Sequence, residues 1–434
     1  MSEQVIAAAS GVTPPGQTIT TELVTFLLVA LAVAGSVSFL LTPVAMRIAR
    51  LVGAIDAPDH ARRVHRLPVA RLGGLAVGTT FIVVGIAAVV LGRESGIVPQ
   101  TFRGRDPIVR SQLDVLFLGV AVAVALGAID DRWQIRARFQ LVWQLLLALI
   151  AISGGILFTR IANPFQILST SLGANLDFEH VLGFEILGEP AVPVILTALW
   201  IVGMINSINW IDGLDGLSAG VSLIAAVTLG IVAITVAPIE PVVGLLCMVL
   251  AGSLAGFLPW NFHPARIFIG TGGVMAVGYA LAVLSILGTA KVAVALLILG
   301  VPIIDTFWII IRRIATGSSP FEPDRGHLHH RLLDLGLSHR GAVLLIYAMS
   351  VVLGLAGIVL SSSGAGPLYA FVGVVLAGGV VLYLVTRHTN DSLDASSYPD
   401  EPPDPPPASR PQDSGPSNSS QATATPGHGT RPAR

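Results

Sequence analysis

The chain carries little charge. Only 12% of its 434 residues are Asp, Glu, Lys or Arg, whereas 53% are hydrophobic, and its mean hydropathy is +0.77. Soluble globular domains contain about 25% charged residues. The composition therefore excludes an ordinary soluble protein and predicts an all-α polytopic membrane protein.

Lysine and cysteine are almost absent. Lys291 is the single lysine among 25 basic residues, and the formal net charge is -1, so no Lys-rich tail and no nucleic acid or other polyanion partner is indicated. Cys247 is the one cysteine, which excludes a disulfide framework and a thiolate metal site. Its place in an apolar run predicts a small buried hydrophobic side chain.

Long apolar runs are abundant. Eleven of them approach the length of about 20 residues that a membrane-spanning helix needs. The first run is too long for a signal peptide core and follows a leader, residues 1–22, without a basic residue, so we expect a span or a signal anchor there. The spans are expected at 23–46, 72–92, 113–129, 139–157, 192–207, 217–236, 242–259, 272–288, 291–311, 341–361 and 366–386.

The distribution of basic residues indicates an orientation. With an N-terminus outside the cell, the inner loops carry fifteen arginines and the outer loops six basic residues, which fits the positive-inside rule. Eleven spans then place the C-terminus in the cytoplasm. Residues 388–434 hold ten of the 28 prolines and are expected to form a disordered cytoplasmic tail.

Polar residues gather at the inner ends of the expected spans. The clusters lie at 56–74, 130–140, 206–217, 261–273 and 323–340. A secondary transporter would place buried acids near the bilayer midplane, so clusters confined to one side argue against that class.

Asp130 and Asp131 are adjacent carboxylates directly after an apolar run. Like charges at this spacing repel unless a cation lies beside them, and a divalent metal or Arg132 would provide it. The alternative is a pair of solvated acids at the end of a span.

The stretch "NSINWIDGLDGL" places four polar residues at intervals of three, namely Asn206, Asn209, Asp212 and Asp215. Residues three apart lie on one side of a helix, and the glycines at 213 and 216 should then end that helix. Carboxylate and amide oxygens suit Mg²⁺. The alternative is that Asp212 and Asp215 are only cap and turn residues.

The segment "GHLHHR" brings three histidines together with Asp324, Arg325 and Arg331. One reading is an anion clamp for phosphates, and another is a zinc site, although so tight a run does not easily surround one tetrahedral ion. Surface histidines without a ligand are the third reading. Together the clusters predict phosphoryl transfer between a soluble nucleotide donor and a lipid acceptor.

Residues 46–350 resemble the polyprenyl-phosphate N-acetylhexosamine-1-phosphate transferases, bacterial membrane enzymes that start cell-envelope polymers. The motifs that carry the resemblance are "IDAPDHARRVHRLPVARLGG", "GAIDDR", "NSINWIDGLDGLSAG", "ARIFIGTGGVMAVG" and "SPFEPDRGHLHHRLLDLGLSHR". The histidine segment is more similar to the branch that uses UDP-GlcNAc than to the muramyl-pentapeptide branch.

The resemblance implies a reaction and its setting. GlcNAc 1-phosphate, or another N-acetylhexosamine 1-phosphate, would pass from a UDP-sugar to undecaprenyl phosphate with release of UMP, and Mg²⁺ or Mn²⁺ would assist. Residues 23–387 would form the catalytic domain in the bacterial cytoplasmic (inner) membrane, with the site facing the cytoplasm. Family enzymes are often homodimers.

The resemblance also implies roles for individual residues. Asp212 would be the principal metal ligand, Asp130 would lie nearest the lipid phosphate, and Asp131 and Asp215 would complete the carboxylate cluster. The expected metal ligands are Asp212, Asp215 and Thr271. The residues expected to hold substrate or water are Asn206, Asn209, Asn261, Arg266, Arg63, His65, His327, His329 and His330.

Thr271 is a departure from the family pattern, because it stands where the family usually has an Asp that is thought to bind the metal. A Thr hydroxyl can coordinate Mg²⁺ but brings no charge. We expect retained activity with low Mg²⁺ affinity. The alternative is a weakened or silent relative that binds lipid phosphate or nucleotide sugar without catalysis.

Overall fold

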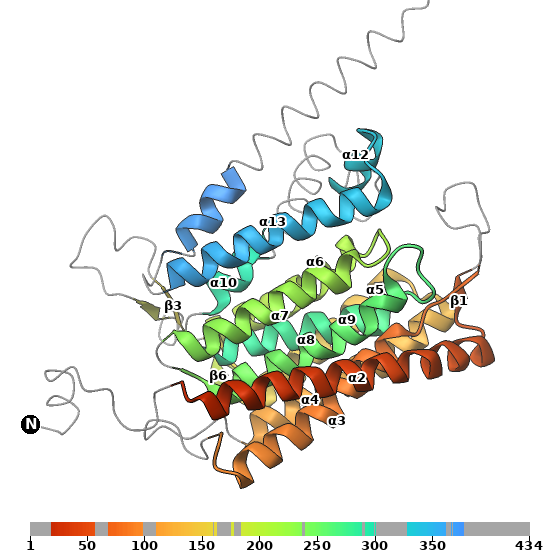
Figure 1. Cartoon of the computed structure of the whole chain (residues 1–434). Coiled ribbons are helices and arrows are strands. Elements are labelled where there is room, and N and C mark those ends of the chain that lie inside the picture. Colours follow the sequence, from red (N-terminus) through yellow and green to blue (C-terminus); the bar gives the residue numbers. More distant parts are fainter. Residues whose placement is uncertain are drawn as a thin grey trace, which may run out of the picture. The chain divides into compact units, whose positions relative to one another are not determined.

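A computed structural model describes residues 19–56, 68–98, 110–158, 160–162, 175–177, 184–236, 239–288, 291–298, 300, 328–361, 366 and 368–376. Long helices that run side by side dominate it (Figure 1). They are α2 (Thr21–Val52), α3 (Gly73–Glu94), α4 (Arg110–Trp133), α5 (Ala137–Ser153), α6 (Ala191–Ile211), α7 (Leu217–Thr235), α8 (Pro241–Asn261), α9 (Gly270–Leu287), α10 (Lys291–Ile298), α12 (Leu328–Asp334) and α13 (His339–Leu360).

The expected polytopic architecture is confirmed in its coarse form. Eight of the helices in the described part of the chain are long and apolar enough to cross a membrane, and α5 is a shorter apolar helix of 17 residues. Helical residues occur at all eleven expected spans within these residues. The expected spans at 291–311 and 366–386 are described only in part, and the tail at 388–434 lies outside the described residues, so the count of eleven stays a prediction.

Helix ends follow local signals in the sequence. Thr20 caps α2 by accepting a hydrogen bond from the Leu23 amide, and Gly53 ends that helix in the left-handed conformation. Ser338 caps α13 in the same way by accepting from Gly341. Gly53 therefore ends α2 just before the polar cluster at 56–74, and Ser338 begins α13 within the cluster at 323–340.

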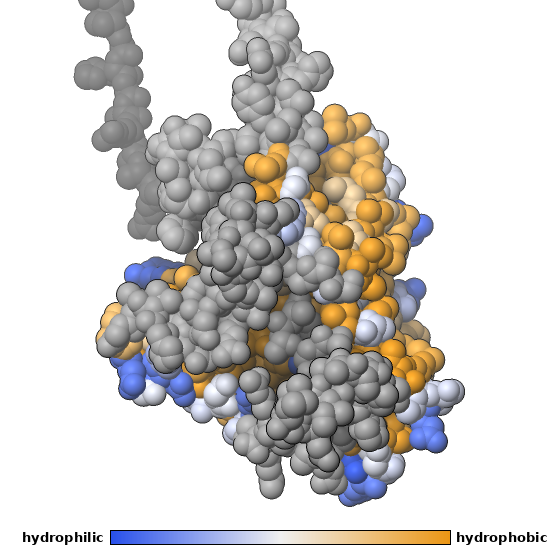
Figure 2. Space-filling model, turned by 90° about the vertical axis from the view of Figure 1, so that its left-hand side faces the viewer, coloured by the Kyte–Doolittle hydropathy of each residue, from blue (hydrophilic) through white to orange (hydrophobic). Residues whose placement is uncertain are grey.

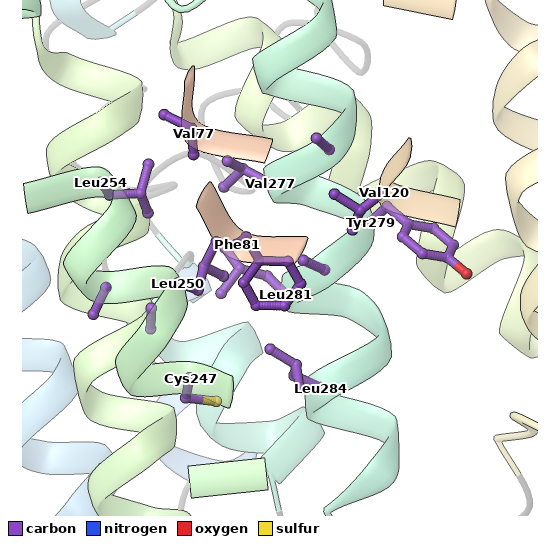
Figure 3. Close-up of a cluster of buried hydrophobic side chains, with 14 of the residues drawn as sticks. Val77, Phe81, Val120, Cys247, Leu250, Leu254, Val277, Tyr279, Leu281 and Leu284 are labelled. Carbon is purple, nitrogen blue, oxygen red and sulfur yellow. The ribbon is translucent and has the colours of Figure 1, made fainter. Parts of the chain in front are cut away.

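Three helices form the interior of the bundle. The buried share of the apolar window is 89% for α8, 83% for α9 and 78% for α7, against 28% for both α2 and α13. Figure 3 shows part of this core, in which side chains from α3, α4, α8 and α9 meet, among them Phe81, Leu250 and Leu281. Cys247 is one of these fully buried side chains, as the sequence predicted.

The outer helices turn apolar side chains outward. Leu40 on α2 is 70% exposed and Val359 on α13 is 73% exposed, although burying such groups is normally favourable in water. Figure 2 shows broad apolar areas on one side of the molecule with hydrophilic residues in smaller patches. This surface suits a hydrocarbon solvent.

Short strands depart from the all-α expectation. Three two-stranded antiparallel ribbons are present among the described residues. They are β1 (Ile55–Asp56) with β2 (Val69–Ala70), β3 (Arg160–Ala162) with β4 (Asn175–Asp177), and β5 (Glu185–Ile186) with β6 (Glu189–Pro190). Since each strand has two or three residues, they fasten loops and leave the helical core unchanged.

The ribbon β1–β2 joins three chain segments at one end of the bundle. The Arg71 amide donates to the Ala54 carbonyl, and the Phe268 amide donates to the Ala70 carbonyl, which forms a parallel bridge between Ala70 and Ile267. The segment before α3 is thereby held against the segment before α9.

Glycines let α3 and α4 approach the start of α9. A Cβ on Gly74 would overlap the backbone of Gly273, and a Cβ on Gly127 would overlap the backbone of Gly272. Only a residue without a side chain allows such backbone contact. The first turn of α9 is therefore enclosed by α3 and α4.

Candidate active site

The paired aspartates lie where α4 meets the first turn of α9. Asp131 accepts hydrogen bonds from the Thr271 amide at 2.8 Å and from the Gly272 amide at 3.3 Å. These are free amide groups of a helix N-terminus, whose partial positive charge favours a carboxylate. Asp131, with its side chain only 1% exposed, thus joins two helices across 140 residues of sequence.

Asp130 is bonded on both carboxylate oxygens. One oxygen accepts from the Ile135 amide at 2.8 Å, and the other accepts from the Thr271 hydroxyl at 2.7 Å. Thr271 therefore contacts both paired aspartates, through its hydroxyl and its amide. The position that departs from the family pattern lies inside the carboxylate cluster.

Arg71 supplies a cation that the sequence reading did not single out. Its guanidinium lies 3.9 Å from Asp131 and 3.7 Å from Asp56. The sequence predicts a divalent metal or Arg132 as the charge partner of the paired aspartates, whereas the described ion pair of Asp131 is with Arg71. The sequence signal was weak, because Arg71 is one of several arginines in its loop.

The stretch "NSINWIDGLDGL" ends α6 and begins α7 as expected. Helix α6 ends at Ile211, Asp212 forms its C-cap, and Gly216 has φ 82°, the left-handed conformation, before α7 begins at Leu217. The Tyr347 hydroxyl of α13 donates to the Gly216 carbonyl and fastens this turn.

The polar residues of this stretch do not share one environment. Asn206 exchanges hydrogen bonds with the buried Gln144 of α5, with its amide nitrogen 2.7 Å from the Gln144 oxygen. It also donates to the Val202 carbonyl, so most of its hydrogen-bonding capacity is used between α5 and α6. Asn209 is exposed. These contacts fit a role for Asn206 in joining α5 to α6 better than the expected contact with substrate or water.

Asp212 is the carboxylate best placed to bind a metal. One oxygen accepts from the Ser218 hydroxyl at 2.6 Å, and its other oxygen accepts no hydrogen bond from the described residues. Burial raises the pKa of Asp212 to about 7, against the lowering effect of the Ser218 hydrogen bond, and Asp131, Arg71 and Asp215 also act on it electrostatically. An incoming cation would favour the ionised form.

Asp215 turns away into a separate cluster. Its Oδ2 lies 2.7 Å from His263 Nδ1 and accepts from the Ala265 amide at 3.1 Å, while its own amide donates to Nε2 of His339 at 3.0 Å. The two imidazole rings are stacked, with centroids 4.1 Å apart and planes 18° apart. Neither histidine was singled out from the sequence.

The composition of this cluster suggests a metal site, since ligand atoms of Asp215, His263 and His339 lie within 4.8 Å of one another. Its geometry does not fit one. An imidazole binds a metal along the nitrogen lone pair, in the ring plane, and two nearly parallel planes do not converge on one ion. His263 and the Ala265 amide both bond Oδ2 of Asp215 and leave its Oδ1 to other contacts, so the expected role of Asp215 as a metal ligand stays a prediction. The arrangement instead orients His263, whose side chain is 33% exposed.

The remaining predicted residues fall into two groups. Asn261 is 2% exposed and donates to the Ile267 carbonyl at 2.9 Å, a position that fits fastening of the 261–267 loop better than contact with a nucleotide. Arg266 is exposed and lies over the Trp260 ring at 5.6 Å. His330 is described and lies on α12. The second group lies outside the described residues and consists of Arg63, His65, His327 and the side chain of His329.

Comparison with known proteins gives the family. A model described as glycosyl transferase family 4 matches residues 113–289. A Bacillus subtilis protein named "Probable undecaprenyl-phosphate N-acetylglucosaminyl 1-phosphate transferase" is 37% identical over 75% of this chain and 82% of its own length. A Mycobacterium tuberculosis decaprenyl-phosphate N-acetylglucosaminephosphotransferase is 31% identical over 74% of this chain and 78% of its own length.

A more distant branch also matches. A Moorella thermoacetica phospho-N-acetylmuramoyl-pentapeptide-transferase is 29% identical over 59% of this chain and 77% of its own length. The predicted similarity to the N-acetylglucosamine branch agrees with the longer matches above. The chain belongs to glycosyl transferase family 4, among the polyprenyl-phosphate N-acetylhexosamine-1-phosphate transferases.

Proposed function

We propose that this enzyme transfers GlcNAc 1-phosphate from UDP-GlcNAc to undecaprenyl phosphate, or a similar polyprenyl phosphate, and releases UMP. The names of its relatives support the acceptor and the transferred group. The product would start a bacterial cell-envelope polysaccharide.

The observation that carries the proposal is the convergence of charge at one end of an apolar bundle. Asp130, Asp131 and Asp212 lie there with Arg71, joined by the contacts of Thr271 and by mutual electrostatic influence. A site at the end of spanning helices can meet a lipid phosphate from the membrane and a nucleotide from water. The excess of arginine in the same loops supports a cytoplasmic orientation in the inner membrane.

The reaction forms one bond and breaks one. A phosphate oxygen of the lipid attacks the phosphorus that carries the sugar, a new pyrophosphate linkage forms, and the bridging oxygen leaves with UMP. Since the second pKa of a phosphate monoester is about 6, the acceptor is mostly ionised at neutral pH. The protein therefore has mainly to position two anions and offset their repulsion.

The chain's own residues divide this work. Asp130 would receive the last proton of a lipid phosphate that arrives protonated, and Arg71 would offset negative charge beside Asp131. His263, held by Asp215, would offer its outer edge to the phosphates of the donor. The histidines at 327, 329 and 330 remain the predicted clamp for the donor pyrophosphate.

The carboxylates fit a magnesium ion. Asp212 would hold it with its available oxygen, and the Thr271 hydroxyl and Asp215 remain the other predicted ligands; Mn²⁺ has similar ligand preferences. A bound Mg²⁺ would neutralise charge on the donor phosphates.

The test is transfer of labelled GlcNAc 1-phosphate by purified protein in mixed micelles with undecaprenyl phosphate, followed by solvent extraction and UMP detection. Asp130→Asn and Asp212→Asn should each lower the rate at least about a hundredfold, the scale of lost positioning and charge stabilisation. Asp114→Asn is the matched control, since Asp114 is exposed at the other end of α4. No transfer by the wild-type protein, or equal loss in all three variants, would contradict the proposal.

A further inference from the structure

The first residues of α13 contact two segments of the candidate site. The Asp215 amide donates to Nε2 of His339 at 3.0 Å, and the Nε of Arg340 donates to the His263 carbonyl at 3.1 Å. The Ser338 cap fixes where α13 begins, so His339 is held in the first turn of that helix. The start of α13 therefore contacts the turn after α6 and the loop after α8 at the same time.

His263 is restrained from three directions. Its Nδ1 lies 2.7 Å from Oδ2 of Asp215, its carbonyl accepts from Arg340, and its ring is stacked on the His339 ring with centroids 4.1 Å apart. A side chain that is 33% exposed would ordinarily choose among several rotamers. The contacts on its edge, its face and its backbone select one orientation of the ring, which is what a binding residue needs.

The packing of α13 does not depend on His339. Helix α13 lies beside α7 (Figure 1), where the Tyr347 ring occupies the place that a Cβ on Gly220 would take and Gly354 lies against Thr228. These contacts lie further along α13 and hold the two helices together. His339 is half-buried at the end of the helix, so its contacts act locally on the turn and on the His263 loop.

The same stretch of chain carries part of the predicted donor clamp. His330 lies on α12, and α12 is joined to α13 by a tight turn in which the amides of Leu335 and Leu337 donate back to carbonyls of α12. The start of α13 therefore lies between the predicted clamp and His263 along the path of these contacts. A change at His339 should act on the nucleotide-sugar donor rather than on the lipid.

We propose that His339 is a positioning residue for the nucleotide-sugar donor. The hydrogen bond from the Asp215 amide fixes the His339 ring, and the face of that ring holds His263 with its outer edge toward the donor phosphates. His339 itself does not contact the substrate. The proposal rests on the proposed function, in which His263 binds these phosphates. Loss of both contacts should raise the dissociation constant and the KM for UDP-GlcNAc about tenfold and leave kcat within about twofold.

The experiment measures UDP-GlcNAc binding to the full-length protein in detergent by calorimetry, together with transfer kinetics in which each substrate is varied. His339→Ala removes both contacts. His339→Gln keeps an acceptor for the Asp215 amide, and His339→Phe keeps a ring against His263, so each should recover part of the affinity. Gly354→Ala is the matched control, because its Cβ would lie 2.8 Å from the Thr228 hydroxyl and loosen α13 away from the site. The control should lower the unfolding temperature and leave the donor KM unchanged.

A double-variant cycle tests whether His339 acts through His263. His263→Ala should itself weaken donor binding. Adding His339→Ala to that variant should change the donor KM by less than about twofold, because the ring that His339 holds is already gone. An independent role of His339 would instead give two effects that multiply.

Three results would overturn the proposal: an unchanged donor KM in His339→Ala, an equal rise in the lipid KM or in the Gly354→Ala control, or full multiplication of the two effects in the double variant. Failure of the proposed function looks different. A wild-type protein that binds UDP-GlcNAc but transfers nothing would contradict the reaction, while weaker binding by His339→Ala would leave the positioning role standing. A wild-type protein that does not bind UDP-GlcNAc would contradict both.

Discussion

Replacing Thr271 with Asp would add a carboxylate to the carboxylate cluster. The Thr271 hydroxyl now donates to Asp130 at 2.7 Å, and its amide donates to Asp131. An Asp side chain at this position cannot donate when ionised, so it would face Asp130 as a like charge. We expect the variant to be less stable without metal and to bind Mg²⁺ more tightly.

The size of the effect follows from these contacts. A hydrogen bond to a charged group contributes about 2 kcal/mol, which the substitution removes. Two unit charges at 4 Å repel by about 4 kcal/mol at an effective dielectric constant of about 20. If a divalent cation relieves half of that repulsion, about 2 kcal/mol, Mg²⁺ affinity rises roughly 30-fold.

The assay is thermal unfolding of detergent-solubilised protein at pH 8, in EDTA and across a Mg²⁺ titration. Thr271→Val is the matched control, because it removes the hydroxyl and adds no charge. In EDTA the unfolding temperature should fall from wild type to Thr271→Val to Thr271→Asp. Added Mg²⁺ should raise it most in Thr271→Asp, since a ligand stabilises by RT ln(1 + [L]/Kd).

An equal response to Mg²⁺ in the Val and Asp variants would refute this reasoning. It would mean that the metal binds away from residue 271 and that the contacts with Asp130 only hold α4 to α9.

Three further outcomes are expected. Because burial raises the pKa of Asp212 to about 7, the folded protein keeps a proton that the unfolded chain loses near pH 4, so metal-free stability should fall as pH rises between about 4 and 7. Mg²⁺ should then stabilise more at pH 8 than at pH 6, and Asp212→Asn should remove this difference. Gly74→Ala should destabilise by several kcal/mol, because its Cβ would overlap backbone, whereas Gly203→Ala, with no atom within 4 Å, should be neutral or stabilising in the same unfolding assay. Gln144→Leu should cost about 1–3 kcal/mol by leaving the Asn206 amide without its partner, and Gln144→Leu/Asn206→Leu should regain most of that loss.

Much of the architecture was predictable because membrane helices follow local rules. A span needs about 20 apolar residues, and the boundaries at Gly53, Gly216 and Ser338 coincide with cap or breaker residues. The sidedness of the polar clusters was also readable, since successive spans alternate direction.

Partners across the bundle were not predictable in the same way. The interval of three in "NSINWIDGLDGL" predicts one polar face, but α6 ends at Ile211, so Asp212 and Asp215 lie beyond the helix and make different contacts. Asn206 pairs with Gln144 on another helix, 62 residues away in the sequence. Side-chain spacing defines a common face only while the helix continues.

The sequence by itself determined the class of protein, the approximate spans and the residues that carry the family resemblance, because composition and motif order are properties of the chain alone. Only the tertiary structure decided that Arg71 is the cation beside Asp131, that Thr271 joins the paired aspartates, and that Asp215 orients His263. These contacts depend on which helix ends meet, and helix packing over glycine contacts is set by the whole bundle.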